Sequence, residues 1–310
     1  MQNEIVVGID TSAYTTSMAA VGRDGALLFD RKQLLDVPMG TRGLRQSDAK
    51  AQHHKNLPEL YGELCVVVPE GQIKGIAVSN RPRPVEGSYM PVFMDGVEFA
   101  AKLANRLNVP LFYFSHQEGH IEAVQHFTPP QNPDKMLSFH LSGGTSELLV
   151  SENGTIKIIG GSKDISFGQL IDRVGVALGM AFPAGGQMDQ MAYGQAAESE
   201  WLKPIPVTDL WFNLSGIETQ CQRRIQEGVP REELVPELFN KISKCLAKVC
   251  DKACRQLNLT EIIMVGGVSS SVTVREYLTR NMKSGKCLFG TYSSDNAVGT
   301  ALLGGKRLWG

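Results

Sequence analysis

LSFHLSGGTSELLVSENGTIKII, residues 137–159, decides the fold, because its order of elements also occurs near the start of the chain. Apolar runs of strand length alternate here with turns that contain Gly, Ser and Asn. The expected strands are 137–141, 147–151 and 155–159. Residues 5–29 show the same order, with expected strands at 5–9, 17–22 and 26–29. An internal repeat of this kind predicts two similar lobes.

Each opening is followed by alternating helices and strands. In the first half we expect helices at 46–64 and 92–107 and strands at 73–79 and 110–115. In the second half we expect helices at 167–179, 234–257, 271–283 and 296–308 and strands at 261–267 and 287–292. The pattern predicts a duplicated α/β fold with two lobes around a central cleft, where ligands commonly bind. The expected lobes are 1–116, with the terminal helix 296–310 packing back on it, and 117–310, with an insertion at about 181–233.

The composition is that of an ordinary globular protein. Lys and Arg number 31 and Asp and Glu 32, so the net charge is −1 and any RNA contact would depend on local basic patches. The six cysteines include no Cys-x-x-Cys pair, and the first residues show no signal-peptide pattern. No apolar run approaches the length that crosses a membrane. We therefore expect a reduced, cytoplasmic protein without membrane contact.

His116 and His120 lie four residues apart in SHQEGHIEAV, directly after an expected strand. On a helix, both imidazoles would leave the same face one turn apart and could share a metal ion. Asp295 follows a strand at the corresponding place in the second half and is a candidate third ligand, although it would serve equally well as a helix N-cap. Two imidazoles and a carboxylate would suit iron, zinc or a similar divalent ion. Histidine pairs at this spacing also occur without any metal.

Two glycine pairs end strands of the second half, in LSGGTS (141–146) and MVGGVSSS (264–271). Glycines allow a ligand to approach the backbone closely, as phosphate sites require, although each pair would also suit a tight turn. Asp172 lies on an expected helix beside an apolar face. It would accept hydrogen bonds from a ribose or substrate hydroxyl, or it is solvated or paired with Arg173.

Several segments follow one another along the chain in a characteristic order: GIDTSAYTTSMAAV (8–21), HQEGH (116–120), LSGGTSELLV (141–150), FGQLIDRVGVALGM (167–180), FPAGGQ (182–187), NLSGIETQ (213–220), GGVSSSVTVREYL (266–278) and SSDNAVGTALL (293–303). In this order they resemble the TsaD family, also called the Gcp or glycoprotease-like family. The resemblance implies the duplicated actin/Hsp70/sugar-kinase fold, which is ribonuclease H-like. It also implies an enzyme that transfers a threonylcarbamoyl group from threonylcarbamoyl-AMP to N6 of the tRNA adenosine beside the anticodon.

The resemblance further implies which residues form the site. The metal would be bound by His116, His120 and Asp295. The adenylate would lie against His140, Leu141, Ser142, Gly143, Gly144, Asp172 and Gly186. Beside what the resemblance implies, the glycine-rich segments add Gly185, Gly266, Gly267 and Ser271 as candidates for the same site. Apart from the resemblance, Asp10 is a candidate catalytic base, or a group behind the metal ligands. The implied partners are tRNA and TsaB- or TsaE-like proteins, or a second copy of the chain.

The chain also departs from the family pattern. It has Ser271 where the family usually has Asn and Asp10 where the family has Glu, and NRPRPVEGSYMPV (80–92) replaces a glycine-rich segment. These differences would fit a divergent paralogue, and they leave a noncatalytic nucleotide-binding scaffold as the main alternative. A metallopeptidase is disfavoured, because Gln117 follows the first histidine where zinc proteases have their glutamate base, and Glu118 comes one position late.

Overall fold

The computed structural model describes residues 4–38, 41, 43–153, 155–197, 199–294 and 297–310, and the chain forms two compact units. Unit 1 comprises Met1–Val37, Leu44–Phe127 and Ser294–Gly310, and unit 2 comprises Pro38–Gly43 and Thr128–Ser293. The division therefore lies after Phe127, whereas the sequence placed it at residue 116. The reason is that α3 (His116–Phe127) packs on α9 (Val298–Trp309), and α9 in turn packs on the strands of unit 1.

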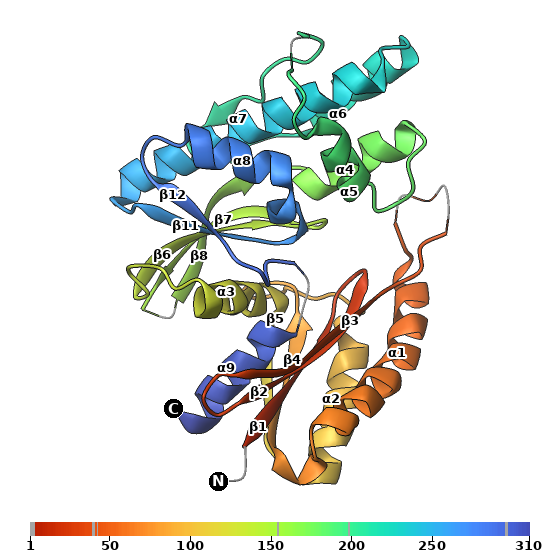
Figure 1. Ribbon diagram of the computed structural model, residues 1–310, viewed down its shortest axis with the longest axis vertical. Helices are drawn as coiled ribbons and strands as arrows, with labels where there is room; N and C mark the ends of the chain where they lie inside the picture. The colour runs from red at the N-terminus through yellow and green to blue at the C-terminus, as the bar shows by residue number, and fades with distance from the viewer. Residues whose placement is uncertain (1–3, 39–40, 42, 154, 198, 295–296) are drawn as a thin grey trace. The chain divides into compact units, whose positions relative to one another are not determined.

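Among the described residues, the sheet of unit 1 has five strands in the order β3-β2-β1-β4-β5. They are β1 (Ile5–Thr11), β2 (Thr15–Gly22), β3 (Leu27–Leu34), β4 (Ile73–Arg81) and β5 (Leu111–Ser115). The first three form an antiparallel meander, and β4 and β5 run parallel to β1. Helices α1 (Gln46–Val67) and α2 (Phe93–Leu107) cover one face and α9 covers the other, while the short η1 (Glu70–Gln72) leads into β4 (Figure 1).

Strand β1 is buried along its whole length, because helices cover both faces of the sheet. This explains why IVVGIDT reads as a continuous apolar run and does not alternate between apolar and polar residues. Val7, Ile9 and Ile76 lie in the resulting core, each with essentially no exposed surface. Asp10 ends this run and is itself buried, which marks it as a polar group that needs a partner.

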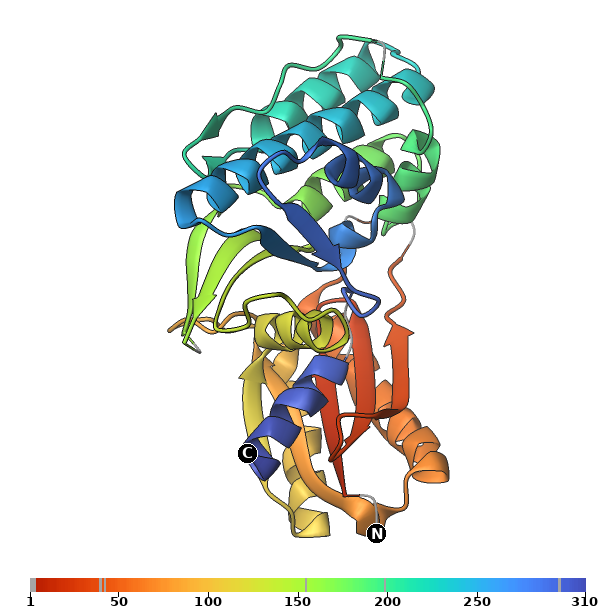
Figure 2. The ribbon, with the colours of Figure 1, turned by 60° about the vertical axis from the view of Figure 1, so that its left-hand side comes forward.

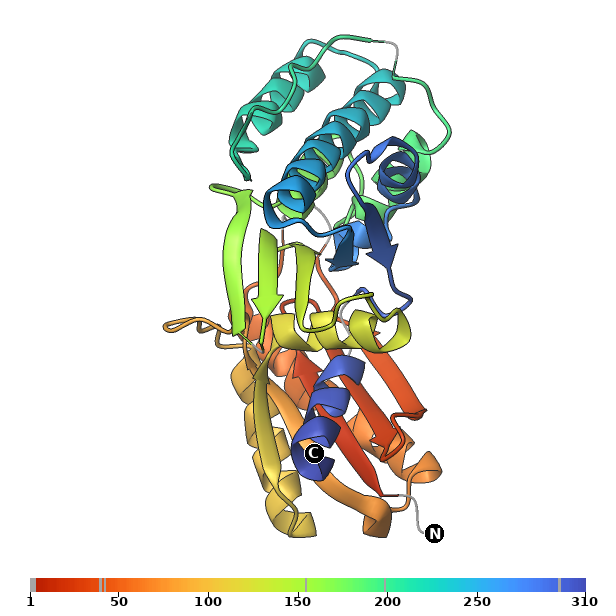
Figure 3. The same ribbon diagram turned by 90° about the vertical axis from the view of Figure 1, so that its left-hand side faces the viewer.

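Unit 2 contains a sheet in the order β12-β11-β6-β7-β8-β10-β9, with its helices gathered on one face (Figures 2 and 3). The strands are β6 (Lys135–Leu141), β7 (Ser146–Glu152), β8 (Thr155–Ser162), β9 (Val207–Thr208), β10 (Trp211–Phe212), β11 (Glu261–Val265) and β12 (Lys286–Phe289). The helices are α4 (Phe167–Ala177), α5 (Gly185–Ala192), α6 (Ser215–Gln226), α7 (Arg231–Leu257), η2 (Gly267–Ser270) and α8 (Val272–Asn281). Within the described residues, none of the helices is both long and apolar enough to cross a membrane.

The two units share one topology, which confirms the predicted duplication. The strands β8-β7-β6-β11-β12 have the same order as β3-β2-β1-β4-β5, and in both sets an antiparallel meander is joined by two parallel strands. The segment 181–233, expected to be an irregular insertion, extends this sheet, because β10 pairs in parallel with β8 and β9 pairs with β10. The sequence did not predict these two-residue strands or α6.

Candidate functional site

The two predicted metal-binding histidines lie on the first two turns of α3, which begins directly after β5. Their Nε2 atoms are 2.9 Å apart, and their ring centroids are 4.3 Å apart at an interplanar angle of 83°. His120 is buried, and the ring of Phe93 lies 5.7 Å from that of His116. The helix therefore places the two imidazoles so that the Nε2 atom of one ring faces the Nε2 atom of the other.

Asp10, at the end of β1, fixes the orientation of the first imidazole. Its Oδ2 lies 2.7 Å from Nδ1 of His116, and the carboxylate is 1% exposed. A carboxylate oxygen at this distance accepts a hydrogen bond from Nδ1–H, which leaves Nε2 of His116 with its lone pair toward His120. Asp10 therefore stands behind His116, on the side of the ring away from the other histidine.

Glu118 caps the N-terminus of α3 together with Ser115. Its Oε2 accepts hydrogen bonds from Ser115 N at 2.7 Å and Ser115 Oγ at 2.6 Å, and Ser115 Oγ in turn accepts from Glu118 N at 3.2 Å. This reciprocal pair is a capping box, which satisfies backbone groups at the start of α3. The only carboxylate between the two histidines is thus engaged away from their facing nitrogens.

Gly119, also between the histidines, serves packing. A Cβ atom built on Gly299 of α9 would collide with the backbone oxygen of Gly119, and one built on Gly119 would lie 2.8 Å from Thr300 Oγ1. The two helices therefore cross at glycines, with backbone nearly touching backbone. Asp295, the third predicted ligand, precedes α9 in the sequence and lies outside the described residues.

The histidine pair fits a metal ion in its donor atoms and spacing. Imidazole nitrogens bind zinc at roughly 2.0–2.1 Å, so two of them on one ion lie about 3 Å apart. The two Nε2 atoms here are 2.9 Å apart. A carboxylate on the far nitrogen of a metal-binding histidine is the usual supporting group. Within the described ranges, no cluster of three or more His, Cys, Asp or Glu side chains is placed to hold an ion.

In unit 2, the loop after β6 forms a tight turn closed by its own hydroxyls. Ser142 Oγ accepts from Gly144 N at 3.2 Å and Thr145 N at 3.0 Å, and Thr145 Oγ1 lies 3.0 Å from Nδ1 of the buried His140. Gly143 O accepts from Ser166 Oγ at 2.7 Å at the start of α4. The predicted nucleotide residues of this loop are thus held in one rigid turn.

The other glycine pair lies beside this turn. Gly266 has φ +91, and a Cβ atom there would collide with the backbone oxygen of Leu141, at the end of the neighbouring strand. The ends of β6 and β11 therefore carry both predicted glycine segments side by side within unit 2.

Some of these glycines have no structural need to be glycine. A Cβ atom on Gly144, Gly186 or Gly267 would meet no described atom within 4 Å, and none of the three has a positive φ. Gly185 is nearly as open, since its nearest neighbour, Ile171 Cγ2, would be 4.0 Å away. These positions leave bare backbone next to open space, as a ligand that approaches the main chain requires.

Asp172 supports the start of α5. Its Oδ1 accepts a hydrogen bond from Ala184 N at 2.9 Å. Burial raises the pKa of this carboxyl, and the backbone N–H groups of Ala184 and Gly185 partly offset the effect. The structure thus gives Asp172 a helix-capping contact in addition to any contact with a ligand.

Ser271 is the N-cap of α8, and it pairs with a residue that the sequence did not single out. Its Oγ accepts from Val274 N at 3.1 Å and donates to Asp189 Oδ1 at 2.6 Å. Asp189, on α5, also accepts from Val272 N and Thr273 N. A serine before an apolar helix is a recognisable N-cap signal, but no local pattern points to its partner 82 residues away.

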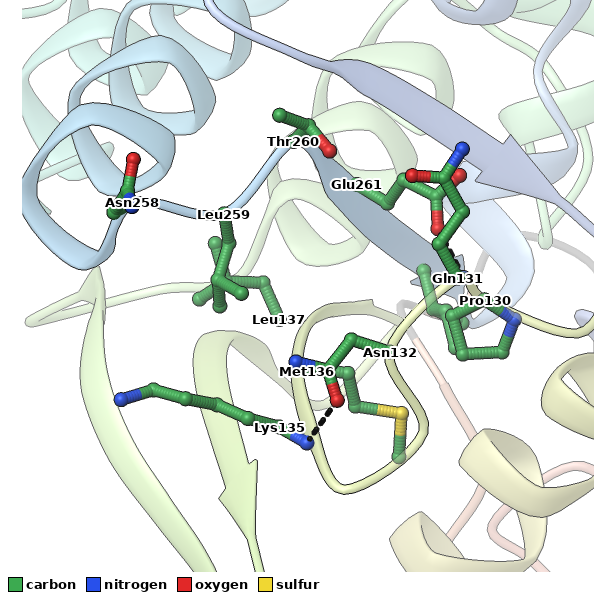
Figure 4. A pocket seen from close by; sticks show the side chains of 11 residues that line it. Pro130, Gln131, Asn132, Lys135, Met136, Leu137, Asn258, Leu259, Thr260 and Glu261 are labelled. Carbon is green, nitrogen blue, oxygen red and sulfur yellow. Dashed lines mark hydrogen bonds between the residues drawn. The ribbon is translucent and has the colours of Figure 1, made fainter.

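A pocket of about 170 Å³ lies at the opposite ends of the same strands, where β6 and β11 begin (Figure 4). Its lining residues are Pro130, Gln131, Asn132, Lys135, Met136, Leu137, Asn258, Leu259, Thr260, Glu261 and Ile263. Two hydrogen bonds join lining residues: Glu261 Oε2 accepts from Gln131 N at 2.6 Å, and Asn132 Oδ1 accepts from Lys135 N at 3.1 Å. None of the predicted site residues lines it.

The topology of the two units is that of the actin, Hsp70 and sugar-kinase class of proteins. The fold resembles HypF of T. kodakarensis with a TM-score of 0.65 at 15% identity, over 99% of this chain and 48% of HypF, so the chain spans about half of that protein. It also resembles a ROK family glucokinase from Streptomyces griseus, with a TM-score of 0.51 at 12% identity, over 97% of this chain and 99% of the glucokinase.

Sequence similarity is more specific. The TsaD family, tRNA N6-adenosine threonylcarbamoyltransferase, matches residues 38–302. The protein of that name from Pyrobaculum calidifontis is 26% identical over 307 residues, which cover 97% of this chain and 87% of the relative. The chain therefore belongs to the TsaD family of enzymes, as its motifs predicted.

Proposed function

We propose that this protein transfers a threonylcarbamoyl group from threonylcarbamoyl-AMP to the N6 amine of an adenosine beside the anticodon of tRNA. The observation that carries the proposal is the contact of His116 and His120 through Nε2 at 2.9 Å, with Asp10 bound to the far nitrogen of His116. Membership of the TsaD family supplies the class of reaction.

The histidines would hold one divalent ion, with iron or zinc as the expected metals. The hydrogen bond to Asp10 would hold the proton of His116 on Nδ1, so that Nε2 is the nitrogen turned toward the ion. Asp295 remains the proposed third ligand, since it precedes α9, the helix that packs on α3. When bound, the ion would supply Lewis-acid stabilisation for the negative charge that develops on the donor.

The adenylate would bind in unit 2, at the turn 142–145 and the open glycines Gly144, Gly186 and Gly267. The open backbone at these glycines lets a phosphate approach the main chain closely. The N–H groups of Gly144 and Thr145 already donate to Ser142 Oγ, and these bonds shape the turn. Asp172 and Ser271 would contribute to this site through the two capping contacts that shape it, at the starts of α5 and α8.

The transfer itself exchanges one acyl bond for another. The N6 nitrogen attacks the carbamoyl carbon, a C–N bond forms, and the C–O bond to the phosphate breaks. AMP leaves with the electron pair of that bond, and the N6 proton is released to solvent. We assign Asp10 a positioning role instead of that of the base, because its carboxylate faces Nδ1 of His116, away from His120.

The test uses labelled threonylcarbamoyl-AMP with unmodified tRNA, and it follows label on the RNA and release of AMP. His116→Ala should lose the transfer and the bound metal, the latter measured by elemental analysis. His126→Ala is the matched control, because His126 lies exposed on the same helix. Transfer by His116→Ala at the wild-type rate would refute the assigned centre, and no transfer by the wild-type protein, with or without partner proteins, would favour the scaffold alternative.

The peptidase alternative lacks its base. Glu118 is the only carboxylate within the histidine motif, and Ser115 occupies it in a capping box. A zinc protease of the His-Glu-x-x-His type needs a glutamate that faces the metal-bound water. We therefore infer no proteolytic activity for this pair.

A further inference from the structure

The segment 80–92, which replaces a glycine-rich segment of the family, is fastened at both ends to the histidine site. At its start, Pro82 O accepts a hydrogen bond from Gln117 N at 3.1 Å, between the two histidines in sequence. At its end, Val92 O accepts from Thr11 Oγ1 at 2.9 Å, next to Asp10. The loop between these anchors leaves the sheet near the start of α3 (Figure 3).

The base of this loop is buried, and its outer part is exposed. Val92 and Phe93 are 1% and 2% exposed and pack in a small apolar cluster with Leu35 and Ala49. Tyr89, in contrast, is 67% exposed. Arg83 N donates to Ser88 Oγ at 3.0 Å, which closes the loop on itself. A large aromatic ring is thus presented to solvent on an anchored support.

The loop also carries positive charge next to the histidines. Arg81 pairs in register with Ser115, the residue before His116, and its guanidinium donates to Asn80 Oδ1 at 3.3 Å. No carboxylate pairs with Arg81 among the residues that the structure describes. Arg83 lies two residues further on, and with Glu86 in the outer part the loop has a net charge of +1.

We propose that the loop 80–92 binds the single-stranded part of the RNA substrate, with Tyr89 stacking on an unpaired base and Arg81 contacting a phosphate. An exposed aromatic ring for stacking and an arginine for a phosphate, carried by one loop, are the two kinds of side chain that bind unstacked RNA. It suits an acceptor whose reacting amine is on a base, because that base must be held out of a stack next to the centre. The inference rests on the proposed function for its substrate class.

The experiment measures binding by fluorescence anisotropy to an RNA hairpin with unpaired loop adenosines, and to a fully paired RNA duplex of equal length. Tyr89→Ala should weaken hairpin binding about 5- to 150-fold, as expected for loss of one stacked base. Tyr89→Phe should retain binding, because the ring remains. Tyr113→Ala is the matched control, since Tyr113 is 48% exposed in the same unit but lies on β5.

Salt dependence separates the two roles. Tyr89→Ala should leave the slope of log Kd against log salt unchanged. Arg81→Ala should reduce the magnitude of that slope by about 1, the value expected for the loss of one phosphate contact. Thermal unfolding of each variant verifies that the fold is retained. The inference is overturned if the wild-type protein binds the hairpin no better than the duplex. It is also overturned if Tyr89→Ala binds the hairpin like the wild type, including the case in which this variant loses binding to a protein partner but not to RNA.

The binding assay and the transfer assay can fail separately. Tyr89-dependent hairpin binding without any transfer would refute the proposed function and leave this inference standing. Transfer to tRNA, together with unchanged hairpin binding by Tyr89→Ala, would refute this inference alone.

Discussion

Gly299 should be the most sensitive glycine of the α3–α9 crossing. In Gly299→Ala the new methyl group collides with the backbone oxygen of Gly119, which cannot turn aside as a side chain can. Relief requires the two helices to separate, and overpacking of this kind costs about 3 kcal/mol at the upper end of its usual range. Alanine regains up to about 1 kcal/mol of helix propensity. The expected net loss is therefore about 2 kcal/mol.

Two other glycines provide matched comparisons. In Gly119→Ala the methyl group meets Thr300 Oγ1, which can rotate if it gives up its contact with Ser79 Oγ at 3.2 Å. That hydrogen bond is worth about 1 kcal/mol, so the net change should be near zero. Gly62→Ala, on α1, has no described atom within 4 Å and should stabilise the protein by about 1 kcal/mol.

Hydrogen–deuterium exchange with mass spectrometry measures the loss of stability separately in α3 and in α9. A loss of about 2 kcal/mol corresponds to roughly 30-fold faster exchange in peptides of α3 and α9. Metal content provides a second readout, because a shift of α3 moves both His116 and His120. The reasoning is refuted if Gly299→Ala exchanges like the wild type, or if it is stabilised to the same extent as Gly62→Ala.

Three further substitutions test single contacts. Asp10→Asn should lower metal affinity about 10- to 100-fold in a competition titration, because it removes the carboxylate behind His116; unchanged affinity would contradict that role. Burial lowers the pKa of His53 below its ordinary value of 6.5, so as pH falls the imidazole is protonated in the unfolded chain before it is protonated in the folded one. The melting temperature of the wild type should therefore fall as pH drops below 6.5, and that of His53→Gln should change less with pH. Burial opposes ionisation of Asp164, but hydrogen bonds from Leu214 and Ser215 lower its pKa to about 2. Asp164→Asn should therefore cost about 1 kcal/mol at pH 7, after discounting for its exposure, and the difference from wild type should shrink as pH falls from about 4 to 2 in urea unfolding.

Much of the fold was predictable because its signals are local. The repeated strand–turn–strand openings predicted the two meanders, and the observed β1 and β6 begin within two residues of the expected strands. Apolar periodicity likewise predicted α7, although more of this helix is buried than a single apolar face. Strands β9 and β10 could not be predicted, since each has two residues, β10 depends on pairing with β8, and β9 depends on pairing with β10. Short elements of this kind are defined by their neighbours and carry too little sequence pattern of their own.

In the candidate site, too, the residues that belong to local motifs were predictable, whereas their distant partners were not. The spacing of His116 and His120 is enough to predict that they face one another on a helix, and the glycine pairs predict bare backbone at strand ends. The partners of these residues are not encoded nearby: Asp10 reaches His116 across 106 positions. Ser271 likewise meets Asp189 across 82 positions. A motif therefore predicts which side-chain and backbone atoms form the site. The carboxylates that support them, Asp10 and Asp189, depend on which elements the fold brings side by side. Changes at such supporting positions should alter affinity and rate in this protein while its motifs remain intact.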